Sequence, residues 1–264
     1  MSTRQAGLSR PVRIVLGTAA VVLSGLVAFL VTVNRTSVTV NAPPPSLPAA
    51  REVAIAPTAA TLVDIALGAM SRTVTVESLR PNDEGLGTAW LIDAKGDFAT
   101  NAHVVSQHLA VRLRERNGHA HAGVVVAVDI GADIAVVRSQ DGFTGAPLPM
   151  RSTAFAVFPQ AVVAIASSAA TGHSDITAET ATGIAADVPV SGDTTTGQPA
   201  STPDYHDMLV LYGQAIYPGN SGGPVLDGSG SVIGIVTLAS RTNPEGYAIP
   251  INRVAAELLA YAAR

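Results

Sequence analysis

Short hydrophobic runs, separated by Gly, Pro and polar turns, dominate the chain after residue 72. In the first half they predict strands at 73–76, 89–92, 97–100, 110–114, 123–128 and 134–138. In the second half they predict strands at 161–166, 176–186, 208–212, 225–226, 232–238 and 246–249. Many short strands at this spacing are typical of a barrel or sandwich, so we expect an all-β domain.

Two flanking segments show helical periodicity instead. Residues 61–70 repeat hydrophobic side chains at three- and four-residue spacing, which predicts a short helix with a face of Leu62, Ile65, Ala66 and Ala69. Residues 252–264 predict an amphipathic C-terminal helix. Asn252 is its expected N-cap, and its apolar face comprises Val254, Leu258, Leu259 and Tyr261.

A longer hydrophobic stretch lies near the N-terminus. Residues 12–33 are rich in Val, Leu and Ala, with Arg13 as their one charge, and about 20 such residues span a bilayer. Together with Arg4 and Arg10, Arg13 favours a cytoplasmic N-terminus. We therefore expect cytoplasmic residues 1–11, a transmembrane signal anchor at 12–33, and a cell-membrane protein whose remainder is extracytoplasmic. A cleaved signal peptide is the alternative, although its apolar region usually has only about 7–15 residues.

The remainder divides into a linker and one domain. Residues 34–60 are rich in proline, which favours an extended stalk, and a disordered tether without a geometric role is the other interpretation. Residues 61–264 form the expected domain, and roughly 200 residues suffice for a substantial core.

Charge and cysteine content narrow the function classes. The net charge is −4 with no basic block outside the N-terminus, so we expect no nucleic-acid partner. The chain has no cysteine, which excludes a thiol nucleophile and cysteine-ligated metals. His119 and His121 alternate with alanine as a metal-binding pair would, but no third ligand stands at a matching spacing. We therefore predict no metal site and no cofactor.

The most specific chemistry lies in the run Gly219-Asn220-Ser221-Gly222-Gly223-Pro224, which places a serine in a glycine-rich turn. A serine hydroxyl becomes a useful nucleophile only when a base removes its proton. Glycines permit a backbone that pushes the hydroxyl outward and aims N–H groups at one point. An ordinary glycine-rich turn is the alternative interpretation.

Two further segments offer the partners of such a serine. His103 ends a predicted strand beside a loop, where a half-exposed general base would stand. Asp133 precedes an apolar run that predicts a buried strand, and a carboxylate there requires a hydrogen-bond donor. The Nδ1–H of a histidine would serve as that donor. Asp129 is the competing carboxylate, but its place before a glycine is more typical of a turn.

Three segments together, 100–105, 129–136 and 218–224, resemble the trypsin-like serine peptidases, and more narrowly the bacterial HtrA/Deg group. The resemblance implies two six-stranded β-barrels, with the catalytic residues meeting in the cleft between them. It also implies a serine endopeptidase that acts on proteins or peptides. Resemblance to this group also implies a role in extracytoplasmic protein quality control or in regulated proteolysis. A catalytically silent scaffold at the membrane is the alternative.

The resemblance assigns individual roles. Ser221 would attack the scissile carbonyl, His103 would move its proton, and Asp133 would orient the imidazole. The backbone N–H groups of Gly219 and Ser221 would form the oxyanion hole. The S1 pocket that accepts the residue before the cleaved bond would be small and apolar, with walls from Ala215, Ile216, Thr237 and Leu238.

Two features depart from the group. Gly213-Gln214-Ala215 replaces the usual Thr-Asp-Ala before the serine turn, which puts the hydrogen bonds supporting that turn in doubt. No PDZ-like segment is recognised after Ile251. Members of the group are often trimers, so a homo-oligomer is an open expectation.

Overall fold

The computed structural model describes residues 59–79, 87–106, 108–143, 145–154, 157–167, 175–188, 205–213, 216–217, 219–240 and 244–264. The predicted cytoplasmic segment 1–11 and transmembrane segment 12–33 lie outside these ranges, as do Ala215 and all but the last two residues of the linker. Within them, no helix combines the length and apolarity needed to cross a membrane.

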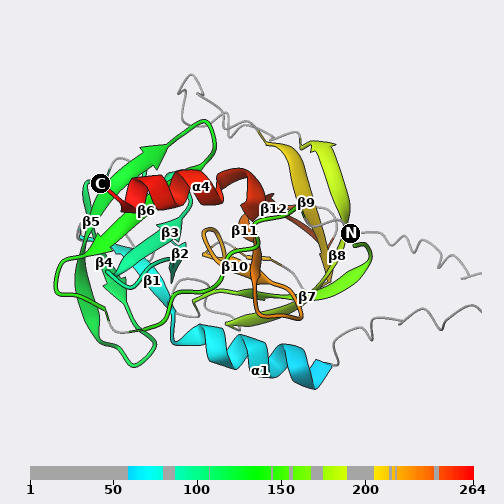
Figure 1. The fold of residues 1–264 in the computed structure, drawn as a ribbon, viewed down its shortest axis with the longest axis horizontal. Helices are drawn as coiled ribbons and strands as arrows, with labels where there is room; N and C mark the ends of the chain where they lie inside the picture. The colour runs from blue at the N-terminus through cyan, green and yellow to red at the C-terminus, as the bar shows by residue number, and fades with distance from the viewer. Residues whose placement is uncertain are drawn as a thin grey trace, which may run out of the picture. The chain divides into compact units, whose positions relative to one another are not determined.

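The described strands close into two six-stranded antiparallel barrels (Figure 1). Around the first barrel the order is β1 (Thr73–Ser78), β2 (Gly87–Leu91), β3 (Asp97–Thr100), β6 (Ile134–Ser139), β5 (Ala120–Asp129) and β4 (Ala110–Arg114). Around the second it is β10 (Pro224–Leu226), β11 (Val232–Ala239), β12 (Glu245–Pro250), β9 (His206–Gly213), β8 (Ile176–Asp187) and β7 (Gln160–Ile165). The prediction of two six-stranded barrels is confirmed.

The strands near the middle of the molecule are buried on both faces. In β2, Ala89 and Leu91 point into the core of the first barrel, whereas Trp90 between them belongs to a second core shared by the two barrels. Ile134 of β6 and Ile235 of β11 belong to the same shared core. Such strands have continuous hydrophobic sequences because neither of their faces contacts solvent. The shared core fixes the two barrels against each other, and therefore fixes the loops between them.

Two helices flank the barrels in Figure 1. Helix α1 (Ala59–Met70) contacts β7 and β1, and helix α4 (Ile251–Ala262) contacts β6, β11 and β12. The prediction of Asn252 as an N-cap is wrong, because Pro250 precedes the first helical residue. Leu259 is also misplaced on the apolar face. It is 47% exposed, while the buried face comprises Ile251, Val254, Leu258 and Ala262.

Arg138 connects the first barrel to α4. Its guanidinium donates to both carboxylate oxygens of Asp97, at 2.7 and 2.9 Å, and to the carbonyl oxygen of Ala262 at 2.6 Å. Asp97 is fully buried. Burial raises the pKa of the Asp97 carboxyl, and the hydrogen bond from Arg138 opposes that rise.

Replacing Arg138 with methionine should leave the Asp97 charge without a partner. We expect the free energy of unfolding at neutral pH to fall by about 2–4 kcal/mol, near the lower end of the range for broken buried pairs, because Arg138 itself is 30% exposed. A carboxyl with a raised folded-state pKa favours folding at low pH and opposes it as pH rises, so the loss should shrink on acidification. Denaturant unfolding at several pH values measures this. A constant loss at every pH would contradict it, and adding Asp97→Asn should restore stability.

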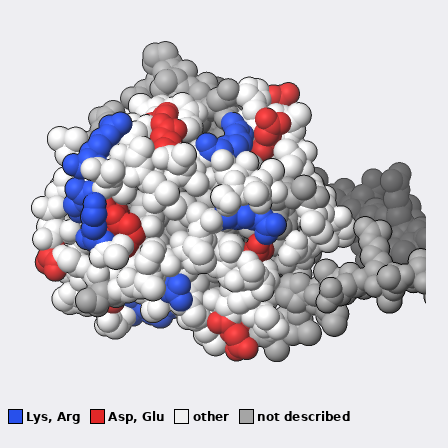
Figure 2. Space-filling model, in the orientation of Figure 1, with Lys and Arg blue, Asp and Glu red and all other residues white. Residues whose placement is uncertain are grey.

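Figure 2 shows one face of the molecule, where Lys and Arg atoms form a short stripe along the left edge beside acidic atoms and elsewhere lie in small groups. The absence of a nucleic-acid partner stays a prediction.

Candidate active site

The prediction that His103 ends a strand is wrong, because His103 lies in a single helical turn. Strand β3 ends at Thr100, and helix α2 (Ala102–Val105) follows. The His103 side chain is 41% exposed. Its Nδ1 lies 2.9 Å from Oδ2 and 3.0 Å from Oδ1 of Asp133, and its backbone N–H donates to Oδ1 at 3.0 Å. One edge of the imidazole is therefore fixed on the carboxylate while the ring stays accessible.

Asp133 is the carboxylate that the structure brings to this histidine. It is 1% exposed and adopts a positive φ of 53°, a conformation that costs a non-glycine residue about 1–3 kcal/mol and persists only where the surroundings impose it. Asn101 contributes to that constraint by donating from Nδ2 to the Asp133 carbonyl oxygen at 2.9 Å. Asp129 instead accepts the N–H of Ala132 at 2.9 Å, which is the geometry of a turn residue.

Ser221 lies on a turn that packs directly against the first barrel. Gly219 and Gly222 on either side have φ values of 96° and 86°, which favour glycine. A Cβ on Gly222 would lie 2.1 Å from the carbonyl oxygen of Thr88, and one on Gly223 would lie 2.2 Å from that of Ile165. These glycines are therefore required by close packing, which an ordinary exposed turn would not need.

Thr88 of β2 also fixes this turn by hydrogen bonds. Its N–H donates to the carbonyl oxygen of Ser221 at 2.9 Å, and its hydroxyl donates to the carbonyl oxygen of Gly219 at 2.8 Å. The same hydroxyl accepts the N–H of Ser167 at 3.0 Å. Among the described residues, neither Gly219 nor Ser221 uses its own backbone N–H as a donor. These are the two amides expected to bind an oxyanion.

Thr237 of β11 joins the three segments. The Ser221 hydroxyl donates to the Thr237 carbonyl oxygen at 3.3 Å. Asn101 donates from Nδ2 to the Thr237 hydroxyl at 3.0 Å, as well as to the backbone of Asp133. In this resting arrangement no hydrogen bond joins Ser221 to His103 within the described ranges. Hydrogen bonds between catalytic groups are often long or misaligned before substrate binds. A rotation of the Ser221 side chain would be needed to bring its hydroxyl to His103.

Residues 87–235 match the family described as Trypsin-like peptidase domain. The chain belongs to the trypsin-like peptidase family. It is 32% identical over 184 residues to the putative serine protease HhoB of Synechocystis, covering 65% of this chain and 39% of that protein. It is 34% identical over 168 residues to the mitochondrial serine protease HTRA2 of Bos taurus, covering 64% of this chain and 34% of that protein.

Solved structures agree on the fold of this peptidase domain. An inactive form of Rv3671c from M. tuberculosis superposes with a TM-score of 0.59 at 24% identity, covering 79% of this chain and 95% of that one. The HtrA-type protease AlgW with a tripeptide gives a TM-score of 0.59 at 22% identity, covering 75% and 62%. The predicted resemblance to trypsin-like peptidases with HtrA homologues is confirmed. The chain spans less than half the length of the curated relatives named above.

Three of the four residues predicted to line the S1 pocket lie within the described ranges, and their environments differ. Ala215 lies outside the described residues. Ile216 is partly buried beside Gly246 of β12, where an added Cβ would lie 2.1 Å from its Cδ1 atom. Leu238 is also partly buried. Thr237 is 4% exposed and directs its hydroxyl to Asn101 and to the Ile235 carbonyl oxygen, so its side chain supports Asn101 and does not face a pocket. The role of Gly246 in making room for Ile216 was not predicted from the sequence.

Tyr205, directly before β9, is a second residue that the sequence analysis missed. Its hydroxyl donates to Asp133 Oδ2 at 3.0 Å, and the side chain is 8% exposed. Burial, then the charge of Asp133, raises the pKa of the Tyr205 phenol. The phenol therefore stays protonated and acts as a donor. No motif in the sequence marks this tyrosine, which belongs to the other barrel.

Replacing Tyr205 with phenylalanine removes a hydrogen bond to the charged Asp133 carboxylate. Part of the free energy of that bond should be lost in the transition state, so we expect kcat/KM to fall by about 10-fold. With one donor fewer, the Asp133 carboxylate should hold a proton on His103 more strongly. The acid limb of the pH profile of kcat/KM should therefore move to higher pH. Tyr212→Phe is the matched control, because Tyr212 is 50% exposed. An unmoved acid limb would assign Tyr205 a purely structural role.

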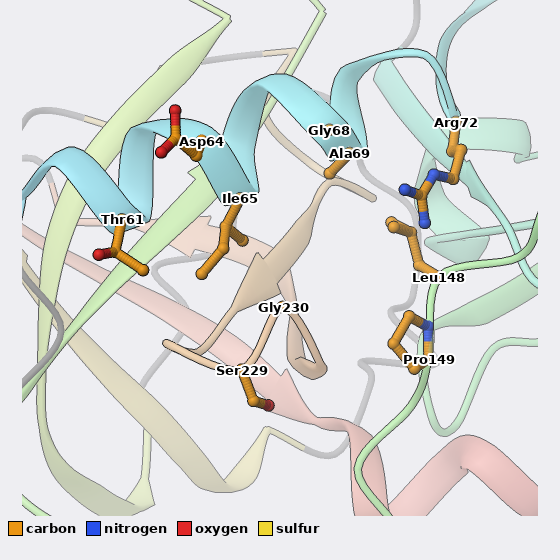
Figure 3. A pocket seen from close by; sticks show the side chains of 10 residues that line it. All are labelled: Thr61, Asp64, Ile65, Gly68, Ala69, Arg72, Leu148, Pro149, Ser229 and Gly230. Carbon is orange, nitrogen blue, oxygen red and sulfur yellow. The ribbon is translucent and has the colours of Figure 1, made fainter. Parts of the chain in front are cut away.

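A separate cavity lies beneath α1 (Figure 3). Its volume is about 440 Å³, and Ile65 and Ala69 of the helix line it opposite Pro149 and Gly230. Its lining includes neither the three catalytic candidates nor the turn around Ser221, so we assign it no part in the chemistry.

Proposed function

We propose that this protein is a serine endopeptidase that uses Ser221, His103 and Asp133. The observation that carries the proposal is the contact of His103 Nδ1 with both Asp133 oxygens, at 3.0 and 2.9 Å. It leaves the other ring nitrogen as the base. Ser221 lies on an adjoining turn, linked through Thr237 and Asn101 to the same carboxylate residue.

The reaction begins when the Ser221 hydroxyl turns from the Thr237 carbonyl oxygen to Nε2 of His103. His103 takes the hydroxyl proton as Oγ attacks the substrate carbonyl, and Asp133 stabilises the imidazolium that forms. The N–H groups of Gly219 and Ser221 bind the oxyanion, and one such donor is worth about 2.7–4 kcal/mol in a comparable site. His103 then gives the proton to the leaving amine, and water releases the acyl group by the reverse sequence.

We propose cleavage after small apolar residues such as Val, Ala or Leu. Ile216 beside Gly246 and Leu238 on β11 would give S1 an apolar lining without a carboxylate to attract Lys or Arg. A pocket of this kind discriminates by only about 1–3 kcal/mol per methylene, so the preference should be broad. Cleavage confined to sites after Lys or Arg would contradict this.

We also propose that residues 12–33 anchor the protein in the cell membrane with the peptidase domain outside the cytoplasm, acting in quality control or regulated proteolysis. The hydrophobicity of this segment and its preceding arginines support the anchor. After an alkaline carbonate wash the protein should stay in the membrane pellet, and release into the supernatant would contradict the proposal. Homologues in the HtrA group suggest a trimer, which sedimentation of the detergent-solubilised protein tests.

A fluorophosphonate probe tests the proposed function. The purified full-length protein should react with the probe, and peptide mapping should place the adduct on Ser221. The same protein should cleave an unfolded substrate, with sites assigned by mass spectrometry. The alternative of a silent scaffold is suggested by the Ser221 hydroxyl, which contacts Thr237 and not His103. Absence of both labelling and cleavage would support that alternative and overturn the peptidase proposal.

A further inference from the structure

We propose that the hairpin between β4 and β5 holds a zinc ion on Glu115, His119 and His121. In the sequence, no third ligand stands at a matching spacing beside the two histidines. The fold supplies one, because Glu115, His119 and His121 each offer a ligand atom within 4.8 Å of the others. Two imidazoles and one carboxylate are a known donor set for Zn²⁺. Mg²⁺ and Ca²⁺ prefer oxygen ligands alone.

The hairpin itself brings these side chains together. Glu115 directly follows β4 and donates its N–H to the carbonyl oxygen of His119 at 2.8 Å, which closes the turn. Gly118 within the turn has a φ of 89°. His119 lies directly before β5 and His121 is the second residue of that strand, and their rings meet edge to face with centroids 4.5 Å apart.

His121 is held in the orientation of a metal ligand. Its Nε2 lies 2.8 Å from Oε1 of Glu115, and its Nδ1 lies 3.2 Å from Oδ1 of Asp141. The hydroxyl of Ser139 fixes that Asp141 oxygen at 3.1 Å. A histidine that donates one ring N–H to a carboxylate and turns the other nitrogen to the metal is a recurrent arrangement in metal sites.

His121 lies between two acidic side chains. Its own side chain is 9% exposed, with Glu115 against Nε2 and Asp141 against Nδ1. A zinc ion on Nε2 would let both carboxylates keep their places beside the ring, Asp141 as the acceptor of the Nδ1 proton and Glu115 as a second ligand of the ion. The nearby cation Arg114 is paired with Glu77.

The site has room for the ion and for a water ligand. His119 is exposed, and the Glu115 side chain is 27% exposed. Zinc ligands at about 2.0–2.2 Å from the ion stand roughly 3.3 Å apart in a tetrahedron. The donor atoms therefore need only modest side-chain rotations, and the solvent side of the hairpin leaves the fourth position to water.

Titration of the purified full-length protein with Zn²⁺, followed by calorimetry, tests the proposal. The His103→Ala background removes competition from the catalytic imidazole. We expect one tight equivalent of Zn²⁺, weakened at least 100-fold by His119→Ala and by Glu115→Gln. Asp141→Asn should weaken it by about 10–100-fold, the usual effect of losing the carboxylate behind a ligand. His206→Ala is the matched control and should bind Zn²⁺ as the parent does.

His119 and Glu115 are the main test positions because both are solvent-accessible, so their variants should fold even if a change at buried His121 does not. Co²⁺ provides a second readout, since tetrahedral coordination by these ligands intensifies its visible absorption. Equal Zn²⁺ affinity in the parent, His119→Ala and Glu115→Gln would overturn the proposal, as would failure to bind Zn²⁺ at all. His121 would then be held only by its hydrogen bonds to Glu115 and Asp141.

Discussion

Replacing Ser221 with alanine is expected to lower kcat on an unfolded protein substrate by about 10⁶-fold, the scale measured when the nucleophile of a comparable serine peptidase is removed. The change deletes one oxygen that accepts no hydrogen bond from another described residue and donates only a 3.3 Å contact to Thr237. The fold should therefore be unaffected while turnover is lost. Cleavage rates of a fluorescently labelled unfolded protein, normalised to the concentration of folded protein, measure the effect.

Ser229→Ala is the matched control for that experiment. Ser229 is an exposed serine on the turn after β10, where its hydroxyl contacts Asp227 and Ser231. Its loss should change kcat by less than about 2-fold, as is usual for surface substitutions away from a site. Equal rates for the parent and Ser221→Ala would exclude Ser221 as the nucleophile.

Replacing Asp133 with asparagine is expected to lower kcat by about 10⁴-fold, as in the template case for this type of catalytic residue. The hydrogen bonds explain why. The backbone N–H of His103 can only donate, so the amide oxygen must take the Oδ1 position. The amide NH₂ then takes the Oδ2 position, 2.9 Å from Nδ1 of the ring in the parent, and donates to it. The imidazole proton moves to Nε2, which can no longer accept a proton from Ser221.

Tyr205 permits this orientation because a phenol can rotate to accept from NH₂ as well as donate to a carboxylate. Asp129→Asn is the control, since an amide oxygen can accept the N–H of Ala132 as the carboxylate does. A rate for Asp133→Asn within 10-fold of the parent would show that Asp133 does not set the tautomer of His103.

The strands were predictable because their signals are local. Alternation, continuous apolar runs and turn residues predict all twelve strands of the two barrels. The serine turn and the segments around His103 and Asp133 were recognisable for the same reason, since each motif lies within a few residues. Asp133 was favoured over Asp129 for the same local reason, and Asp133 is the residue that contacts His103.

The residues that escaped prediction act across long separations. Tyr205 donates to a carboxylate 72 residues away in the sequence, and Asn101 reaches Thr237 across 136 residues. No local pattern encodes such contacts. Glu115 is a different case, since it lies only four residues before His119 but does not fall on the i, i+2 spacing of the two histidines. The turn of the hairpin brings it to them.

The hydroxyl of Thr88 joins the serine turn to the end of the segment that follows β7. It donates to the carbonyl oxygen of Gly219 and accepts the N–H of Ser167, so one atom of the first barrel holds two segments of the second. Because a single oxygen fixes both segments, displacing one of them weakens the hold on the other. The positions of Gly219 and Ser167 are therefore coupled to each other through β2.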